Sequence, residues 1–170
     1  MRSILLLCGP DGADDYAVQL AAASGDDLGL VNTAIAPGDL KASGCRIEDE
    51  RPYGGQALSV LDEPLSVGSA IAQLAGHADA VILDRLDDWA ARLHQHDDDE
   101  ADIASEITSV ESVIAGQLAD VVLISRPTGT LEGAAGAWHQ RMLDAYTPLC
   151  DTVLDLTSGT PLAVKGELPA

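Results

Sequence analysis

This chain has few basic residues, and that shortage excludes two classes of partner. Its 170 residues include nine Lys and Arg against 28 Asp and Glu, so the net charge is −19. Such a charge repels the phosphates of nucleic acids and the head groups of anionic membranes, and we expect no binding to either. An acidic surface with little lysine also fits a cytosol of high salt, where screening relieves the repulsion between like charges.

Aromatic residues are also scarce. The chain has two Trp, three Tyr and no Phe, although 46% of its residues are hydrophobic. We therefore expect a folded protein whose core is filled by small apolar residues, alanine above all. The length predicts one domain over residues 1–170.

Cysteines and long apolar runs give little sign of disulfides or membrane segments. Cys8, Cys45 and Cys150 are odd in number and lack the spacing of metal ligands. They are expected to be reduced and buried, as in a cytoplasmic protein. The apolar run at 4–8 is too short for a signal peptide, and no stretch of about 18 apolar residues could cross a bilayer.

Short apolar runs alternate with helical patterns along most of the chain. The segment 36–64 lacks this periodicity and is expected to hold either a short helix near 38–45 or a β-hairpin about Tyr53-Gly54-Gly55. The helix expected at 101–118 has an apolar stripe that ends at Leu118. Strands are expected at 3–7, 28–35, 80–84, 120–125, 152–156 and 161–164, and helices at 14–23, 66–75, 87–93, 101–118 and 133–147.

This alternation predicts an α/β three-layer sandwich with a mostly parallel central sheet. In such sheets ligands bind beyond the carboxyl ends of the strands. The segments that matter most for function are therefore 8–15, 36–40, 84–88 and 125–131.

Residues 8–16 stand where a P-loop would lie, between a buried strand and a helix. A P-loop needs a glycine, four residues and then Gly-Lys-Ser/Thr, because backbone N–H groups and the lysine neutralise phosphate oxygens. Gly9 and Gly12 lie among the four middle residues of this pattern, but Ala13, Asp14 and Asp15 replace its last three residues. The candidate nucleotide-binding residues here are thus two glycines and two carboxylates.

These carboxylates have two interpretations. At the start of a helix, Asp14 and Asp15 can cap the free N–H groups and favour the helix dipole. Alternatively, they form a Mg²⁺ or Ca²⁺ site with Asp84, which ends a strand as a Walker B acid does. Asp87 and Asp88, just beyond, are expected to be a solvated strand end and helix cap.

Two arginines and four histidines complete the set of candidates. Arg126 follows a strand and Arg141 lies on a helix, and each can bind an anion with two hydrogen bonds or form salt bridges with the many acids. His94 and His96 are expected in an exposed polar loop, because their spacing does not put them on one helix face. The remaining two, His77 and His139, are expected at the surface or the edge of the core.

Taken in order, these features resemble the adenosylcobinamide kinase / adenosylcobinamide-phosphate guanylyltransferase family. The strand 121–125 and residues 136–143 resemble that family's strand and Gly-x-x-Asn-Gln-Arg-x-Leu helix, and 153–166 resemble its closing strands. Residues 46–52 resemble its Arg-Ile-x-His-His-Arg segment. The resemblance implies a RecA-like P-loop fold, GTP or ATP with Mg²⁺ as cofactor, a role in cobalamin biosynthesis, and a homo-oligomer.

The chain departs from the family where the chemistry lies. The P-loop lysine is missing, Asp49 and Glu50 stand in place of the nucleophilic histidine, and Pro127 replaces a glutamate. One hypothesis is a diverged member that lacks kinase and guanylyltransferase activity and binds a nucleotide, a corrinoid or a partner subunit. The other is an active enzyme of the same pathway that holds its metal with rearranged acidic residues.

Overall fold

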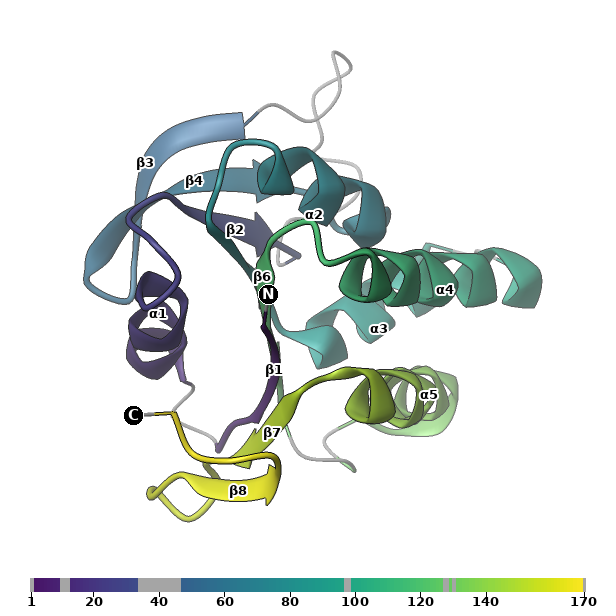
Figure 1. The fold of residues 1–170 in the computed structure, drawn as a ribbon. Coiled ribbons are helices and arrows are strands. Elements are labelled where there is room, and N and C mark those ends of the chain that lie inside the picture. The colour runs from purple at the N-terminus through teal and green to yellow at the C-terminus, as the bar shows by residue number, and fades with distance from the viewer. Residues whose placement is uncertain are drawn as a thin grey trace.

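The computed structural model describes residues 2–9, 13–33, 47–96, 99–126, 129 and 131–169. Its strands are β1 (Ser3–Leu7), β2 (Leu28–Asn32), β3 (Ile47–Tyr53), β4 (Gln56–Asp62), β5 (Ala80–Asp84), β6 (Asp120–Ser125), β7 (Thr152–Asp155) and β8 (Leu162–Lys165). Its helices are α1 (Asp14–Ala22), α2 (Val67–Ala75), α3 (Leu86–Gln95), α4 (Glu100–Gly116) and α5 (Gly133–Leu149) (Figure 1).

The described strands form one sheet in the order β3-β4-β2-β5-β6-β1-β7-β8. The six inner strands are parallel to one another, whereas β3 and β8 pair antiparallel with β4 and β7 at the two edges. Parallel strands are buried on both faces, which explains why β1, β5 and β6 read as short apolar runs. The expected mostly parallel α/β architecture is confirmed.

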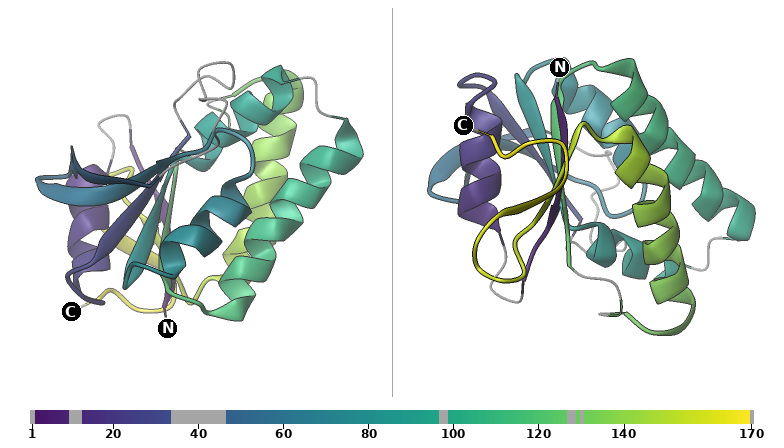
Figure 2. Two further views of the ribbon diagram at one scale, coloured as in Figure 1. Left: turned by 90° about the horizontal axis from the view of Figure 1, so that it is seen from above. Right: turned by 60° about the horizontal axis from the view of Figure 1, so that its bottom comes forward.

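Helices cover the two faces of the sheet unequally. Figures 1 and 2 show α1 alone on one face and α2 to α5 on the other. Successive residues of β1 point to opposite faces, so Leu5 joins the cluster beneath the four helices while Ile4 and Leu6 join the cluster beneath α1. The expectation that alanine above all fills the core was wrong, because leucine is the most frequent residue in both buried clusters, although Ala17 and Ala21 are buried beneath α1.

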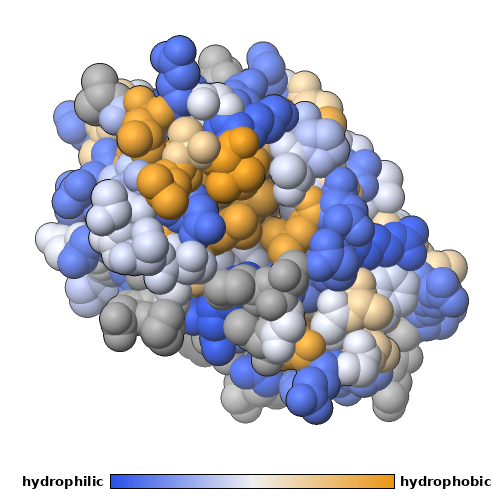
Figure 3. Space-filling model, turned by 90° about the horizontal axis from the view of Figure 1, so that it is seen from below, coloured by the Kyte–Doolittle hydropathy of each residue, from blue (hydrophilic) through white to orange (hydrophobic). Residues whose placement is uncertain are grey.

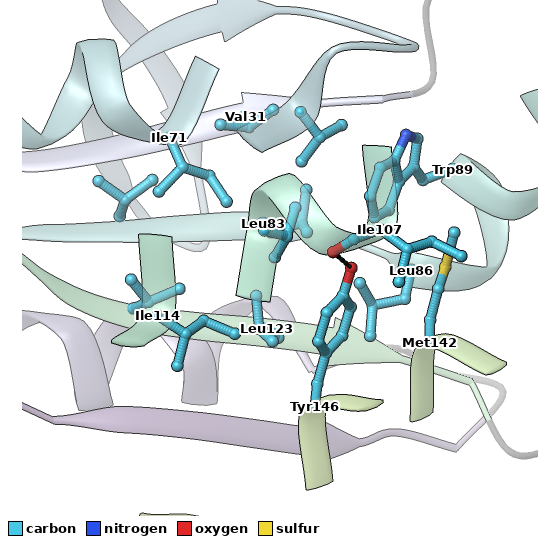
Figure 4. Packing of buried hydrophobic residues seen from close by; sticks show 14 of the residues in the cluster. Val31, Ile71, Leu83, Leu86, Trp89, Ile107, Ile114, Leu123, Met142 and Tyr146 are labelled. Atoms are coloured by element: carbon cyan, nitrogen blue, oxygen red, sulfur yellow. Dashed lines mark hydrogen bonds between the residues drawn. The ribbon is translucent and has the colours of Figure 1, made fainter. Parts of the chain in front are cut away.

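The larger core contains several of the rare aromatic residues. Trp89 and Tyr146 are fully buried among leucine, isoleucine and valine side chains (Figure 4). The Tyr146 hydroxyl donates to the carbonyl of Ile107 at 3.0 Å, and Trp89 Nε1 donates to the carbonyl of Leu65 at 2.8 Å. Each ring therefore contributes apolar area without leaving its polar atom unpaired.

Two local expectations are decided by backbone geometry. The helix expected to reach 118 ends at Gly116, because Gln117 adopts a left-handed conformation (φ 50°). Leu118 is therefore 57% exposed rather than part of the buried stripe, and that expectation was wrong. The hairpin between β3 and β4 is confirmed, and Gly54 and Gly55 at its turn both have positive φ.

Some other expectations are only partly covered. The alternative helix near 38–45 lies outside the described residues, as does Cys45. Cys8 and Cys150 are buried free thiols, as expected. Within the part of the chain that the structure describes, no helix is long and apolar enough to cross a membrane.

Candidate functional site

The candidate site lies at the carboxyl ends of β1 and β6, two neighbouring strands. The chain leaves β1 toward α1 on one face of the sheet and leaves β6 toward α5 on the other. The amide of Cys8 donates to the carbonyl of Ser125 at 2.8 Å, which continues the pairing of the strands to this point. Such a reversal opens a crevice at which α/β proteins bind ligands.

After β1, two carboxylates stand in the first turn of α1. Asp14 and Asp15 are both exposed there, where the helix dipole favours negative charge. Ala13 occupies the N-cap position and provides no side-chain cap. Gly9 lies beside the segment that follows β7, where a Cβ on this glycine would be 3.6 Å from the Cα of Thr157, and Gly12 lies outside the described residues.

Tyr53, at the end of β3, connects Asp14 with Asp84. Its hydroxyl oxygen lies 3.1 Å from Asp14 Oδ1 and 3.3 Å from Asp84 Oδ1. Burial, and then the charge of Asp14, raise the pKa of Asp84 to about 6. Burial and the two carboxylates also raise the pKa of Tyr53 well above its usual value, so this hydroxyl keeps its proton.

One hydroxyl proton cannot satisfy two carboxylates at once. Tyr53 donates its proton to one of the two carboxylates. The contact between the Tyr53 oxygen and the other carboxylate is favourable only when a proton or a cation lies between those two oxygens. The raised pKa of Asp84 means that this carboxyl takes up such a proton more readily than an ordinary aspartate. The two carboxylates and the Tyr53 hydroxyl therefore form a site that favours binding of a proton or a cation.

The hairpin turn holds Tyr53 in this position. Gly54 lies so close to α1 that a Cβ there would be 2.7 Å from the carbonyl oxygen of Asp14 and 2.7 Å from Val18 Cγ2. The turn therefore needs glycine both for its positive φ and for this contact. The role of Tyr53 was missed at the sequence level, since β3 and α1 are joined only by the fold.

Arg126, which follows β6, is bound by two aspartates of α3. Its Nε lies 2.8 Å from Asp87 Oδ2 with the geometry of an ion pair rather than a hydrogen bond, and its Nη2 lies 3.0 Å from Asp88 Oδ1. Its backbone amide also donates to Asp87 Oδ1 at 3.1 Å. Of the two interpretations of Arg126, salt bridging is the one observed. Asp87 is only 1% exposed, so the expected solvated strand end was wrong for this residue.

A buried serine and histidine lie behind this ion pair. Ser125 Oγ is 2.6 Å from His139 Nε2, and both residues are buried. Ser125 donates its own proton to the carbonyl of Arg126 at 2.9 Å, so His139 is the donor in the pair. Burial lowers the pKa of His139. The expectation of a surface or core-edge position was wrong, because α5 packs this histidine against the end of β6.

The other candidates take simpler places. Arg141 is exposed on α5, and its guanidinium lies 5.2 Å from the centre of the Trp138 ring. His77, His94 and His96 are exposed, as expected, but His94 lies within α3 and not in a loop, so that part of the expectation was wrong. The proposed anion-binding role of Arg141 stays a prediction.

The residues at the site do not fit a triphosphate by themselves. Carboxylates stand where a phosphate-binding cation is needed, and both nearby acids of α3 already engage Arg126. For a metal ion, Asp14 and Asp84 offer two hard oxygen ligands. Among the described residues, no group of three or more acidic, histidine or cysteine side chains could hold a metal, so Asp15 does not complete the expected set.

Comparison with known proteins indicates the class of fold. Searches against protein-family models and against curated proteins found no match. Among solved structures, the chain resembles the KaiC-like protein PH0186 from the hyperthermophilic archaeon Pyrococcus horikoshii OT3, with a TM-score of 0.58 and 15% identity over 98% of this chain and 79% of that one. The RadB recombinase gives a TM-score of 0.47 and 11% identity over 91% and 73% of the two chains.

The fold is therefore the α/β fold of the KaiC-like protein, with a mostly parallel central sheet, as the sequence predicted. At this level of identity the likeness concerns the fold alone. The resemblance to the cobinamide enzymes is supported only as far as this α/β fold.

Proposed function

We propose that this chain is a diverged P-loop protein that works by binding or assembly and not by phosphoryl transfer. A single observation carries the proposal: Asp14, in the first turn of α1, shares the Tyr53 hydroxyl with Asp84. The helix start that receives phosphates in a P-loop protein is thus directed at a tyrosine and a second carboxylate.

The size of the electrostatic change supports the loss of ordinary nucleotide binding. A like-charge contact at about 4 Å costs about 1 kcal/mol in bulk water and about 4 kcal/mol near a protein surface. Where a P-loop has a lysine that attracts the phosphates, this chain has Asp14, which repels them. The combined change of several kcal/mol corresponds to about three or more orders of magnitude in triphosphate affinity.

The resemblance of the sequence to the cobinamide enzymes suggests what is bound. The diverged chain would bind a corrinoid, a partner subunit of that pathway or a nucleotide that carries no triphosphate, as a homo-oligomer. Asp49 and Glu50, in place of the family's histidine, favour a protein without guanylyltransferase activity. Transfer of phosphate depends almost wholly on positioning and charge stabilisation, so the kinase reaction is the activity most affected.

Thermal unfolding in the presence of nucleotides tests the proposal. We expect ATP or GTP alone to leave the melting temperature unchanged, because a ligand stabilises only what it binds in the folded state. Asp14→Lys should then confer a rise with ATP. Asp102→Lys is the matched control, since it makes the same charge change in the first turn of α4, away from the site. A metal-free rise with the unaltered chain would contradict the proposal.

A second candidate is an active enzyme that uses a metal ion. The observation in its favour is that Asp14 and Asp84 both reach one hydroxyl, so one divalent cation could take the place of that proton. This candidate predicts a Mg²⁺-dependent rise in melting temperature with GTP that Asp84→Ala abolishes. It also predicts conversion of adenosylcobinamide to its phosphate above a no-protein control, which would refute the binding proposal.

A further inference from the structure

The strand β8 leaves one edge of the sheet open and apolar. β8 is the last strand in the order of the sheet, so no described strand pairs with its outer side. Leu162 and Val164 are 55% and 61% exposed on it, and Leu168 just beyond is 52% exposed. Figure 3, viewed from the side on which β8 lies in Figure 1, shows apolar side chains gathered on this face among hydrophilic ones.

The opposite edge of the sheet is protected in a way that β8 is not. β3 contains Pro52, which has no amide proton to donate to another strand. β8 has the sequence LAVK, whose one charge is Lys165. That lysine is turned away: its Nζ donates to the carbonyls of Thr147, Pro148 and Cys150 at 2.6–3.2 Å. The open edge therefore has no charged residue that prevents pairing.

Charge around β8 indicates what kind of strand fits there. Asp155 lies opposite Leu162 on β7, and hydrogen bonds from Thr157 hold its pKa below the usual range. Asp151 and Glu167 are exposed at the other end of the strand. A second copy of this chain would bring its own charge of −19 to the same acidic surroundings. A basic segment would meet complementary charge instead.

We propose that β8 accepts, as a ninth strand, an extended segment of a partner protein in which apolar and basic residues alternate. Main-chain hydrogen bonds to the open edge would provide affinity, as in β-strand addition. Asp155 is paired with Leu162 and so lies on the same face as Leu162 and Val164. The basic set of side chains would lie on this face, with their aliphatic stems over Leu162 and Val164 and their charges toward the acid, and the apolar set would lie on the face of Ala163. This inference does not depend on the proposed function.

Binding of synthetic peptides tests the proposal. A short peptide of alternating Val and Lys is titrated into the labelled protein, with amide chemical shifts recorded by NMR. We expect the largest shifts in β8 and at least about tenfold weaker binding for a Val-Glu peptide. N-methylation along one edge of the Val-Lys peptide, which removes strand hydrogen bonds, should weaken binding as strongly. The proposal would be overturned if the Val-Glu peptide or the N-methylated peptide bound as tightly as the Val-Lys peptide. Chemical-shift changes centred away from β8 would also overturn it.

Substitutions on the protein provide the matched control. Leu162→Ser with Val164→Ser removes exposed apolar area without changing charge, and should weaken Val-Lys binding at least about tenfold. Leu118→Ser removes a side chain of similar exposure elsewhere and should change binding less than about twofold. Equal effects of the two variants would overturn the proposal. So would a dimer in light scattering that the double variant abolishes, because β8 would then be covered by a second copy.

Discussion

At the scale of single residues, Tyr53 places one hydroxyl proton between two carboxylates. The free-energy cost of placing two carboxylates side by side falls mainly on Asp84, which is more buried than Asp14. A carboxylate that is buried beside another carboxylate destabilises the folded chain whenever both are ionised. The site therefore carries a strain that stability measurements can detect.

We expect Asp84→Asn to stabilise the protein above pH 6. The folded pKa of Asp84 is about 6, above its unfolded value of 3.8, so the ionised form is disfavoured in the folded state. The gain should be about 1–3 kcal/mol at pH 8, shrink as pH falls through 6, and vanish near pH 4. Urea unfolding across this range measures it, with Asp102→Asn on exposed α4 as control. No greater stability than the control at pH 8 would contradict the prediction.

His139 should have the opposite dependence on pH. Burial lowers its folded pKa, so the unfolded chain binds a proton more readily and the folded state loses stability as pH falls below about 6.5. The difference in unfolding free energy between the unaltered chain and His139→Gln should therefore narrow from pH 7 to 5. His77→Gln, at an exposed position, should give a constant difference. All proteins in this comparison should also carry Asp84→Asn, because Asp84 titrates in the same pH range and its effect on stability has the opposite sign. A constant difference for His139→Gln as well would show that this histidine titrates normally.

At the scale of elements, the β3–β4 hairpin fixes the site by resting on α1. The turn contacts the first turn of the helix through Gly54, and the strand before it contributes Tyr53. The hairpin itself could be predicted from the Gly-Gly pair. Its contact with α1 could not, because nothing in the spacing of residues 14 and 53 indicates that they meet.

A pair of glycine substitutions separates this contact from backbone strain. Gly54→Ala and Gly55→Ala both place a side chain at positive φ, but only at position 54 would the new Cβ lie 2.7 Å from the carbonyl of Asp14. We expect Gly55→Ala to cost about 1 kcal/mol and Gly54→Ala about 1–3 kcal/mol more. Chemical denaturation measures both. Equal losses would mean that the hairpin does not press on α1.

The helices and strands that the sequence predicted well are those with strong patterns. β1, β5 and β6 are short, mostly apolar runs, and α2 and α5 begin within a residue of their expected positions. Errors lie where one residue's conformation or contact decides the outcome. Gln117 ends α4 early, and packing of α5 buries His139 beside Ser125. Such outcomes depend on neighbours distant in the sequence, which periodicity does not describe.

At the scale of the whole molecule, the acidic composition governs stability. A net charge of −19 on a chain of this size opposes compaction through self-repulsion. Salt shortens the reach of that repulsion to about 8 Å at physiological ionic strength and about 3 Å at 1 M.

We therefore expect the melting temperature to rise with sodium chloride up to about 1 M. The rise should be largest at neutral pH and shrink toward the isoelectric point, where the net charge vanishes. Scanning calorimetry at neutral pH and near the isoelectric point measures the rise in melting temperature. Sucrose provides the control, because it is excluded from the protein surface but does not screen charge. A rise of the same size at both pH values would contradict the electrostatic explanation.

The sequence by itself determined the layered α/β architecture, the carboxylates at the start of α1 and the acidic surface, because apolar periodicity and charge are properties of neighbouring residues. Only the tertiary structure decided that Tyr53 joins Asp14 to Asp84, that Asp87 and Asp88 bind Arg126, and that β8 is an open edge. These features depend on segments that are far apart in the chain, and they follow from the spatial order of the strands in the sheet.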